Sequence, residues 1–332
     1  MATIKDIARK TGRSVSTVSV VLRNEAQRFG IRPETEKEIR QAAKELGYVK
    51  NDCARTMASG KSRVIGFLTA VRSSVEYPGR LLSGALERAS AREYALRVFH
   101  YDPEVPDSLI TTLLSQQIRG ILISGDLGRP AADRIIAECS GRGIRCVTVN
   151  LSNQVEGFGI VSYDAGGMKK LVEWLFAHGH RKIAMLSCSS QEEYARKRLN
   201  GYLAGMRSCG LRDAVFGPSS GGYPSLARLR ETGFSAVMCD TDYTAASLMQ
   251  QAYRDGIRVP ETISVCGFAG MQVADFAALP LTTVDQDFEG MGETAAEMLI
   301  NVLEKGILPE PGKIKNISLP TRLNIQKTTK GV

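Results

Sequence analysis

The segment from Val15 to Arg23 places hydroxyl side chains on one face of a short predicted helix. Ser16, Thr17 and Ser19 lie on this face, and Arg23 lies at its end. Short hydroxyl and apolar side chains can contact base edges and methyl groups in the major groove of DNA. Cations beside such a helix can reach phosphate oxygens, and the sequence supplies Lys5, Arg9, Arg13 and Arg28. This pattern favours binding to double-stranded DNA.

Three short helices are predicted to position these side chains. Thr3 is an N-cap residue with an acid three residues later, and Gly12 ends the first helix. Ser14 caps the second helix, and Pro33 begins a third that closes before Gly47. We therefore expect a helix-turn-helix unit over residues 3 to 47. A helical cap on an α/β enzyme would have the same small-residue spacing and is the alternative.

The distribution of charge distinguishes a DNA-binding helix-turn-helix unit from a helical cap on an enzyme. Residues 1 to 60 contain 12 Lys and Arg against 7 Asp and Glu, whereas the remaining residues contain 31 against 28. A basic segment on a nearly neutral body indicates a polyanionic partner. The charge and the polar helix face together favour DNA binding.

Several other classes of protein are not supported by the sequence. The seven cysteines are dispersed, with no C-x-x-C pair, and are expected to be reduced. His178 and His180 flank Gly179 in a predicted solvated turn without further ligands nearby, so no metal site is expected. The N-terminus is charged and no apolar run approaches the roughly 18 residues of a membrane span. We expect a cytoplasmic protein without a cofactor or a membrane partner.

From residue 64 onward, apolar strand-like runs alternate with segments of helix length. The runs are VIGFLTA, ALRVFHYD, GILISG, CVTVNL, GIVSYD, KIAMLSC, AVMCD and ISVCGF. This alternation predicts an α/β fold with parallel sheets covered on both faces. Neither G-x-G-x-x-G nor G-x-x-x-x-G-K-[ST] follows any of these strands, so nucleotide-cofactor chemistry is not expected.

The chain resembles the lactose and galactose repressor family of bacterial transcription regulators over nearly its whole length. The motifs that carry the resemblance are TIKDIARKTGRSVSTVSVVL, ELGYVKNDCARTMASGKS, GHRKIAML, ARKRLNGYLAGM, GIRVPETISVCGF and PLTTVDQDFEGMG. The resemblance implies a small all-α helix-turn-helix domain followed by a two-lobed domain similar to type I periplasmic binding proteins. It also implies a regulator, most often a repressor, and not an enzyme.

The resemblance also implies domain boundaries. The DNA-binding domain is expected at 1–48, a hinge segment at 49–62, and an effector-binding and dimerisation domain at 63–332. Lobe 1 of that domain is expected at 63–161 and 290–314, and lobe 2 at 162–289 and 315–332. The sequence ends QKTTKGV without the tetramerisation helix of longer family members, so a homodimer is expected.

The DNA contacts implied by the resemblance fall in the helix-turn-helix and in the hinge. Val15, Ser16 and Val20 occupy the base-reading positions, and Met57 stands where a leucine usually enters the minor groove. Val15 and Val20 can make only apolar contacts, which predicts an operator rich in A·T under these residues. The full expected set is Thr3, Ile4, Lys5, Arg13, Ser14, Val15, Ser16, Thr17, Ser19, Val20, Arg23, Asn51, Cys53, Ala54, Arg55 and Met57.

The resemblance places an effector pocket between the two lobes. Arg198 is the most informative residue in it, because a guanidinium can hold a carboxylate or two hydroxyls. An ion pair between Arg198 and Asp242 is the structural alternative. The full expected set is Ser73, Ser74, Asp126, Asn150, Tyr163, Arg198, Tyr223, Asp242 and Gln286.

The pocket departs from the family pattern at Tyr163, Thr241 and Ala269. A less acidic and more aromatic cleft still suits a saccharide or its derivative, which is the expected effector. A regulator without a working effector site is one alternative. A cleft enzyme acting on a carbohydrate or nucleoside, with a carboxylate pair drawn from Asp126, Asp242 and Asp285, is the other. The expected partners are therefore a pseudo-palindromic DNA operator, a small-molecule effector and a second copy of the chain, with the protein on the nucleoid when bound.

Overall fold

The computed structural model describes residues 2–48, 62–70, 76–102, 106–152, 157–188, 192–218, 222–276, 279–306 and 314–332. The chain divides into two compact units, Met1–Arg63 and Val64–Val332. Within the described part, none of the helices is both long and apolar enough to cross a membrane.

The described part of the first unit contains three helices, α1 (Ile4–Thr11), α2 (Val15–Leu22) and α3 (Pro33–Glu45). Their apolar faces meet in one small core, in which Ile7, Val18 and Ile39 are fully buried. Gly12 adopts a left-handed φ of 65° after α1, a conformation that costs glycine little, and so allows the tight turn into α2. The helix-turn-helix prediction is confirmed.

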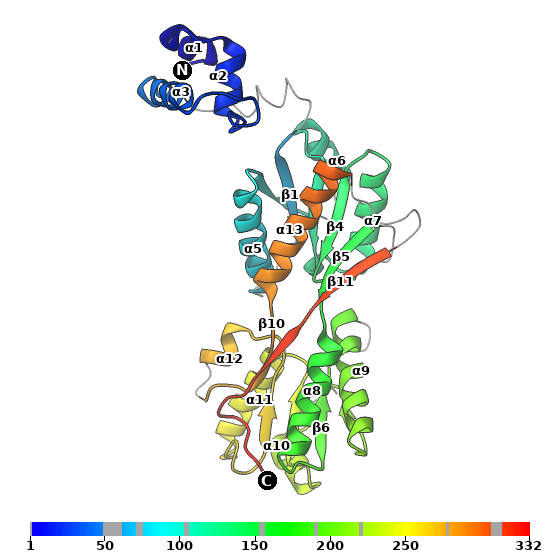
Figure 1. The fold of residues 1–332 in the computed structure, drawn as a ribbon. Coiled ribbons are helices and arrows are strands. Elements are labelled where there is room, and N and C mark those ends of the chain that lie inside the picture. The colour runs from blue at the N-terminus through cyan, green and yellow to red at the C-terminus, as the bar shows by residue number, and fades with distance from the viewer. Residues whose placement is uncertain are drawn as a thin grey trace. The chain divides into compact units, whose positions relative to one another are not determined.

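The second unit begins with a parallel six-stranded sheet in the order β11-β5-β4-β3-β1-β2, which defines lobe 1. Its strands are β1 (Val64–Thr69), β2 (Ala95–His100), β3 (Gly120–Ser124), β4 (Arg145–Val149), β5 (Gly157–Ser162) and β11 (Ile314–Leu319). The helices of this lobe are α5 (Tyr77–Ala91), α6 (Pro106–Ser115), α7 (Arg129–Ser140) and α13 (Phe288–Lys305), with a short 3-10 turn, η1 (Gly125–Leu127). Figure 1 shows α5 and α13 side by side on this sheet.

Lobe 2 has a parallel four-stranded sheet in the order β7-β6-β8-β9. Its strands are β6 (Ile183–Leu186), β7 (Val215–Phe216), β8 (Ala236–Cys239) and β9 (Ser264–Cys266). Its helices are α8 (Asp164–Ala177), α9 (Glu193–Ser208), α10 (Leu226–Glu231), α11 (Asp242–Arg254) and α12 (Gln272–Phe276). Each of the eight expected strand segments contains a strand, which confirms the predicted parallel α/β fold.

The chain passes between the lobes three times: from β5 to α8, from β10 (Thr283–Gln286) to α13, and from β11 to β12 (Thr321–Asn324). Strands β10 and β12 pair antiparallel, separately from the two large sheets (Figure 1). The third passage follows Leu319, five residues later than the expected lobe boundary after 314. The reason is that residues 314 to 319 pair in register with β5 of lobe 1.

Helices α5 and α13 approach each other closely because glycines stand at their crossing. A Cβ atom at Gly84 would overlap the carbonyl oxygen of Glu289, and one at Gly292 would overlap that of Leu81. Two arginines of α5 and Arg92, which caps its C-terminus, then pair with glutamates of α13 along the same contact. This packing fixes α13, the first element after the second passage, firmly to lobe 1.

Candidate functional site

The first helix of the DNA-binding unit is capped as the sequence predicts. The Thr3 amide donates to Oδ2 of Asp6 (2.9 Å), and the Asp6 amide donates to Oγ1 of Thr3 (3.4 Å). This reciprocal capping box satisfies two otherwise unpaired amides at the helix start. The Thr3 hydrogen bonds are the main reason that the pKa of Asp6 is lowered.

Helix α2 buries one face and exposes the face proposed to contact DNA. Ser14 caps it by accepting from the Thr17 amide (3.0 Å), and Val18 and Val21 are fully buried. Val15 on the other face is 48% exposed. A large apolar side chain with that exposure at the start of a helix is available for contact with a partner. The exposed side of α2 thus consists of short hydroxyls and valines.

The cations around α2 are solvent-exposed. Arg13 pairs with Glu38 (3.0 Å) and Arg23 with Glu25 (3.4 Å), all four side chains being about one third to one half exposed. Surface pairs of this kind contribute at most about 1 kcal/mol, so the guanidinium groups can exchange them for phosphate oxygens. The hinge residues Asn51, Cys53, Ala54, Arg55 and Met57 lie outside the described residues, as do Ser73 and Ser74.

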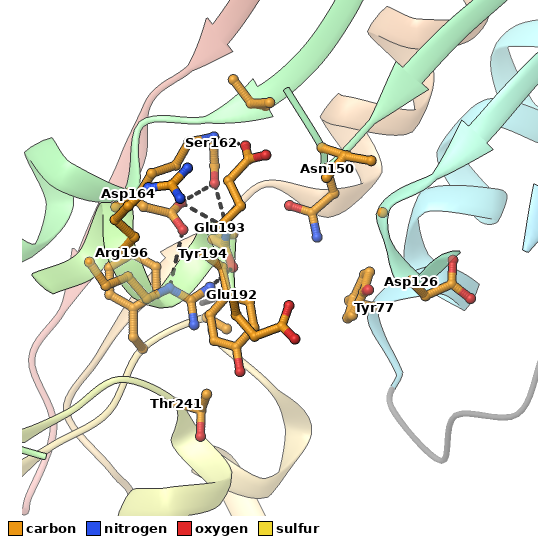
Figure 2. A pocket seen from close by; sticks show the side chains of 18 of the residues that line it. Tyr77, Asp126, Asn150, Ser162, Asp164, Glu192, Glu193, Tyr194, Arg196 and Thr241 are labelled. Atoms are coloured by element: carbon orange, nitrogen blue, oxygen red, sulfur yellow. Dashed lines mark hydrogen bonds and ion pairs between the residues drawn. The ribbon is translucent and has the colours of Figure 1, made fainter. Parts of the chain in front are cut away.

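A cavity of about 670 Å³ lies between the two lobes of the second unit. Figure 2 shows Tyr77, Asp126 and Asn150 of lobe 1 facing Asp164, Tyr194 and Thr241 of lobe 2. Of the expected effector residues, the structure brings together on the cavity wall Asp126, Asn150, Arg198 and Gln286.

Arg198 is the centre of the lobe 2 wall. Its side chain is only 6% exposed. Nε donates to Oδ2 of Asp164 (3.1 Å), Nη1 to the carbonyl of Asp240 (2.6 Å), and Nη2 to Oε1 of Gln286 (2.9 Å). The guanidinium also lies 4.2 Å from the ring centroid of Phe268. These contacts hold it rigidly, with three of its five N–H groups engaged.

The counter-ion of Arg198 is Asp164 and not Asp242, so the structural alternative of an Arg198–Asp242 ion pair is wrong. The Asp164 carboxylate is buried and also accepts from Nε2 of Gln286 (2.9 Å) and from the Ser162 hydroxyl. Ser162 ends β5 and Asp164 begins α8, so this network sits at the first passage between the lobes. The position of Asp164 at the start of a helix after a buried strand is a signal that the sequence analysis missed.

Asp126 supplies a prepared acceptor on the lobe 1 wall. Its Oδ2 accepts from Oγ1 of Thr69 (2.6 Å) and from the amide of Ala70 (2.8 Å). Its Oδ1 is buried and has no hydrogen-bond partner among the residues that the structure describes. An unpaired buried carboxylate oxygen is unfavourable, and a ligand hydroxyl or N–H would satisfy it. Asn150 stands beside this wall with a left-handed φ of 58°.

Three expected effector residues do not line this cavity. The Tyr163 side chain is 58% exposed and its ring packs over the backbone of Gly166. The Tyr223 hydroxyl is buried without a partner among the described residues but lies outside the lining, and burial raises the pKa of Tyr223. Asp242 is buried at the start of α11, where it has a structural role.

The Asp242 carboxylate joins three elements of lobe 2. Its Oδ2 accepts from the amide of Met271 (2.8 Å) and its Oδ1 from the Thr283 hydroxyl (2.6 Å). Burial raises its pKa to about 6, against the opposing effect of these hydrogen bonds. Asp285 pairs with Arg322 (3.2 Å) and lines a different cavity, so the carboxylates suggested for an enzyme are not assembled around one cleft.

The departures from the family pattern also have structural explanations. Thr241 caps α11 by accepting from the Thr244 amide (3.0 Å) and lines the cavity. Ala269, also on the wall, has φ 118°, a conformation rare for a residue with a side chain. Phe268 and Phe288 add the aromatic character that the sequence analysis assigned to Tyr163.

His180 is an exception to the predicted solvated turn. It is 1% exposed, and its ring nitrogens contact Oγ of Ser235 and the carbonyl of Lys330, each at 2.9 Å. It anchors the C-terminal segment to lobe 2. Over the described residues, no cluster of three or more His, Cys, Asp or Glu could hold a metal ion.

Comparisons with known proteins agree with both parts of this fold. Residues 3–51 match the family "Bacterial regulatory proteins, lacI family", and residues 172–329 match "Periplasmic binding protein-like domain". The chain is 28% identical to the HTH-type transcriptional regulator GntR of Pseudomonas aeruginosa, over 91% of this chain and 89% of that protein. It is 27% identical to the ribose operon repressor of Bacillus subtilis, over 99% of both.

Solved structures show the same architecture. A Lac repressor dimer bound to operator and an anti-inducer has a TM-score of 0.74 at 24% identity, covering 99% of both chains. The complex of the regulator CelR with cellobiose has a TM-score of 0.66 at 21% identity, covering 99% of this chain and 100% of that one. The chain therefore combines a lacI-family DNA-binding domain with a periplasmic binding protein-like domain and is a DNA-binding transcriptional regulator rather than an enzyme.

Proposed function

We propose that this protein is a homodimeric repressor whose affinity for its operator changes when a sugar or sugar derivative binds between the lobes. The unpartnered Oδ1 of Asp126, opposite the fixed guanidinium of Arg198, carries this proposal. We place the protein in the cytoplasm, on the nucleoid when the operator is bound.

A sugar suits the unused polar groups of the cavity. Asp126 offers an acceptor, Arg198 has two further N–H groups, and Asn150 can donate and accept. Hydroxyl groups of a saccharide can meet all three, while Phe268 and Tyr77 provide apolar surface for a ring face. The names of two similar proteins, a ribose operon repressor and a regulator solved with cellobiose, support the same class of effector.

The operator contacts are assigned to α2 and to the cations around it. Two copies of α2 would read two half-sites of a pseudo-palindrome, and exposed Lys5 and Arg13 would contact phosphates. Val15 and Val20 favour thymine methyl groups. The hinge contacts through Asn51–Met57 remain expectations from the family.

A second copy of the chain is the proposed occupant of two exposed apolar regions. In lobe 1 the edge strand β2 leaves Val98 51% exposed. In lobe 2, Tyr253 and Phe276 are 86% and 83% exposed and line a groove of about 1060 Å³. Exposure of large aromatic side chains on this scale is typical of an interface. Tyr253→Glu with Phe276→Glu should halve the mass measured by sedimentation, whereas Val215→Glu should not.

A regulator without a working effector site is the second candidate, favoured by the loss of polar groups at Thr241 and Ala269. A regulator with a working effector site and one without it should respond differently to a substitution of Asp126. Substitution Asp126→Asn keeps one oxygen to accept from Thr69 and Ala70 but converts the unpaired acceptor into a donor. The variant should fold at least as well and lose effector affinity by about fivefold or more, on the basis of about 1–3 kcal/mol for a mismatched polar group.

Selection of bound duplexes from a random library at fixed salt tests the DNA-binding part. The proposal predicts a two-fold-symmetric site with A·T pairs under Val15 and Val20. Val20→Arg should change the preferred base at its position in both half-sites, most readily to guanine. A site without symmetry, or an unchanged preference in the variant, would reject the assignment of α2.

A further inference from the structure

Glu193 joins the two lobes across the cleft although no ligand is needed to complete the contact. It is the first residue of α9 in lobe 2. One carboxylate oxygen accepts from Nη2 of Arg129, which begins α7 in lobe 1. The other accepts from the amide of Ser152 (3.1 Å), after β4 in lobe 1. Both lobe 1 groups therefore bind the same side chain of lobe 2.

Lys197 completes the arrangement one helical turn later. Its Nζ lies 2.6 Å from Oε1 of Glu193 and donates to the hydroxyl of Ser152 (2.8 Å). The Lys197 ammonium thus crosses between the lobes as well. Two oxygens of one carboxylate and one lysine make four polar contacts, three of which link lobe 1 to lobe 2.

The Glu193 cluster is partly withdrawn from solvent. The side chains of Arg129 and Glu193 are 21% and 15% exposed. Burial opposes ionisation of Glu193, but hydrogen bonds from Lys197 and Ser152 outweigh it and lower the pKa to about 2. Charge-assisted hydrogen bonds in such a setting are stronger than surface pairs and keep their geometry. The contact needs hydrogen-bond distances, so it cannot persist if the lobes separate.

Glu193 also borders the effector cavity, together with Arg129 and Lys197. Figure 2 shows it between Ser162 and Tyr194. A further interlobe contact, from Nη1 of Arg80 to the carbonyl of Gly270 (2.9 Å), lies beside α13 at the second passage between lobes. The Glu193 cluster thus links the lobes at the border of the cavity itself.

We infer that Glu193 is a latch that holds the lobes together in the absence of effector and so sets the free energy of opening the cleft. The regulatory meaning of this latch rests on the proposed function, because lobe opening matters only if a ligand enters. A ligand can shift the open and closed populations only by its difference in affinity for them. The latch therefore sets the ratio of open to closed molecules before any ligand binds.

Hydrogen–deuterium exchange of the full chain without ligand or DNA tests the latch. In Glu193→Ala, peptides covering residues 129–133 and 150–152 should exchange at least about fivefold faster than in the unsubstituted protein. Glu173→Ala removes a carboxylate whose ion pair, with Lys169 (3.5 Å), lies within α8, and should leave these peptides unchanged. Unchanged exchange in Glu193→Ala, or an equal rise in both variants, would overturn the inference.

Two further readouts separate a latch from general destabilisation. A rise of the same size in β3, in the centre of the lobe 1 sheet, would mean that the substitution loosens the whole lobe and would overturn the inference. Arg129→Ala should speed exchange in the same peptides as Glu193→Ala does, whereas Arg129→Lys, which keeps a cation beside Glu193, should stay within about twofold of the unsubstituted protein. Unchanged exchange in Arg129→Ala would exclude this pair from the latch. Neither readout uses effector or operator, so a failed latch and a failed function remain distinguishable.

Discussion

Replacing Arg198 by methionine should destabilise lobe 2, because the guanidinium holds structure as well as facing the cavity. The substitution keeps much of the apolar packing against Phe268 but removes three hydrogen bonds. It also leaves Asp164, whose side chain is 4% exposed, without its counter-ion. Removing one partner of a buried ion pair costs about 3–5 kcal/mol. We expect a loss in that range in the free energy of unfolding.

A second substitution, at Asp164, tests whether the unpaired Asp164 charge causes the loss of stability. In Arg198→Met with Asp164→Asn, both members of this buried ion pair are neutral, so at least half of the lost stability should return. Arg196→Met, at an exposed neighbouring position of α9, should change stability by less than about 0.5 kcal/mol. The contrast between the two arginines isolates the effect of burial.

Urea unfolding followed by tryptophan fluorescence measures these changes. Trp174 is the chain's only tryptophan and lies on α8, the helix that Asp164 begins, so its signal reports on lobe 2. With a slope of about 2–3 kcal/mol per molar urea, Arg198→Met should lower the midpoint by about 1–2 M. A loss below about 1 kcal/mol, or a double variant less stable than the single one, would refute the reasoning.

Three further predictions concern packing, pH and helix capping. Gly84→Ala should lower the free energy of unfolding by about 1–3 kcal/mol, because the new Cβ would overlap the backbone of Glu289. Gly79→Ala on the same helix has open space around it and should be neutral or stabilising by up to about 1 kcal/mol. Asp242, with its pKa raised to about 6, binds its proton more tightly in the folded state than in the unfolded state. The free energy of unfolding should therefore fall by up to about 3 kcal/mol as the pH rises from 4 to 6. Unfolding midpoints measured across this pH range should show no such fall in D242N. Thr3→Ala should lower the stability of the DNA-binding unit by about 1 kcal/mol, seen in its melting by circular dichroism.

The DNA-binding unit was predictable from sequence because its signals are local. The Thr3 and Ser14 caps, the turn at Gly12 and the buried valines of α2 each follow from residues within one helical turn. The eight main strands were predictable for a similar reason, since a buried parallel strand is a continuous apolar run. Strands β7, β10, β11 and β12 lack such runs and were not expected.

The cleft was only partly predictable because its contacts are distant in sequence. Arg198 was identified, but its partner lies 34 residues away in Asp164 and not in Asp242. Asp242 resembles a ligand residue in sequence, yet the Met271 amide and Thr283 hydroxyl use its oxygens. No local pattern distinguishes a carboxylate that faces a cavity from one that joins three elements.

Effector titration of the selected operator complex tests the central claim most directly. Operator affinity would be measured at fixed salt for the unsubstituted protein and for Asp126→Asn, over a panel of sugars and sugar derivatives. The account predicts that one compound changes the affinity of the unsubstituted protein at least about tenfold and leaves Asp126→Asn nearly unaffected, although both bind the operator equally without ligand. A compound that changes both affinities equally, or a variant that no longer binds the operator, would contradict control through this cleft.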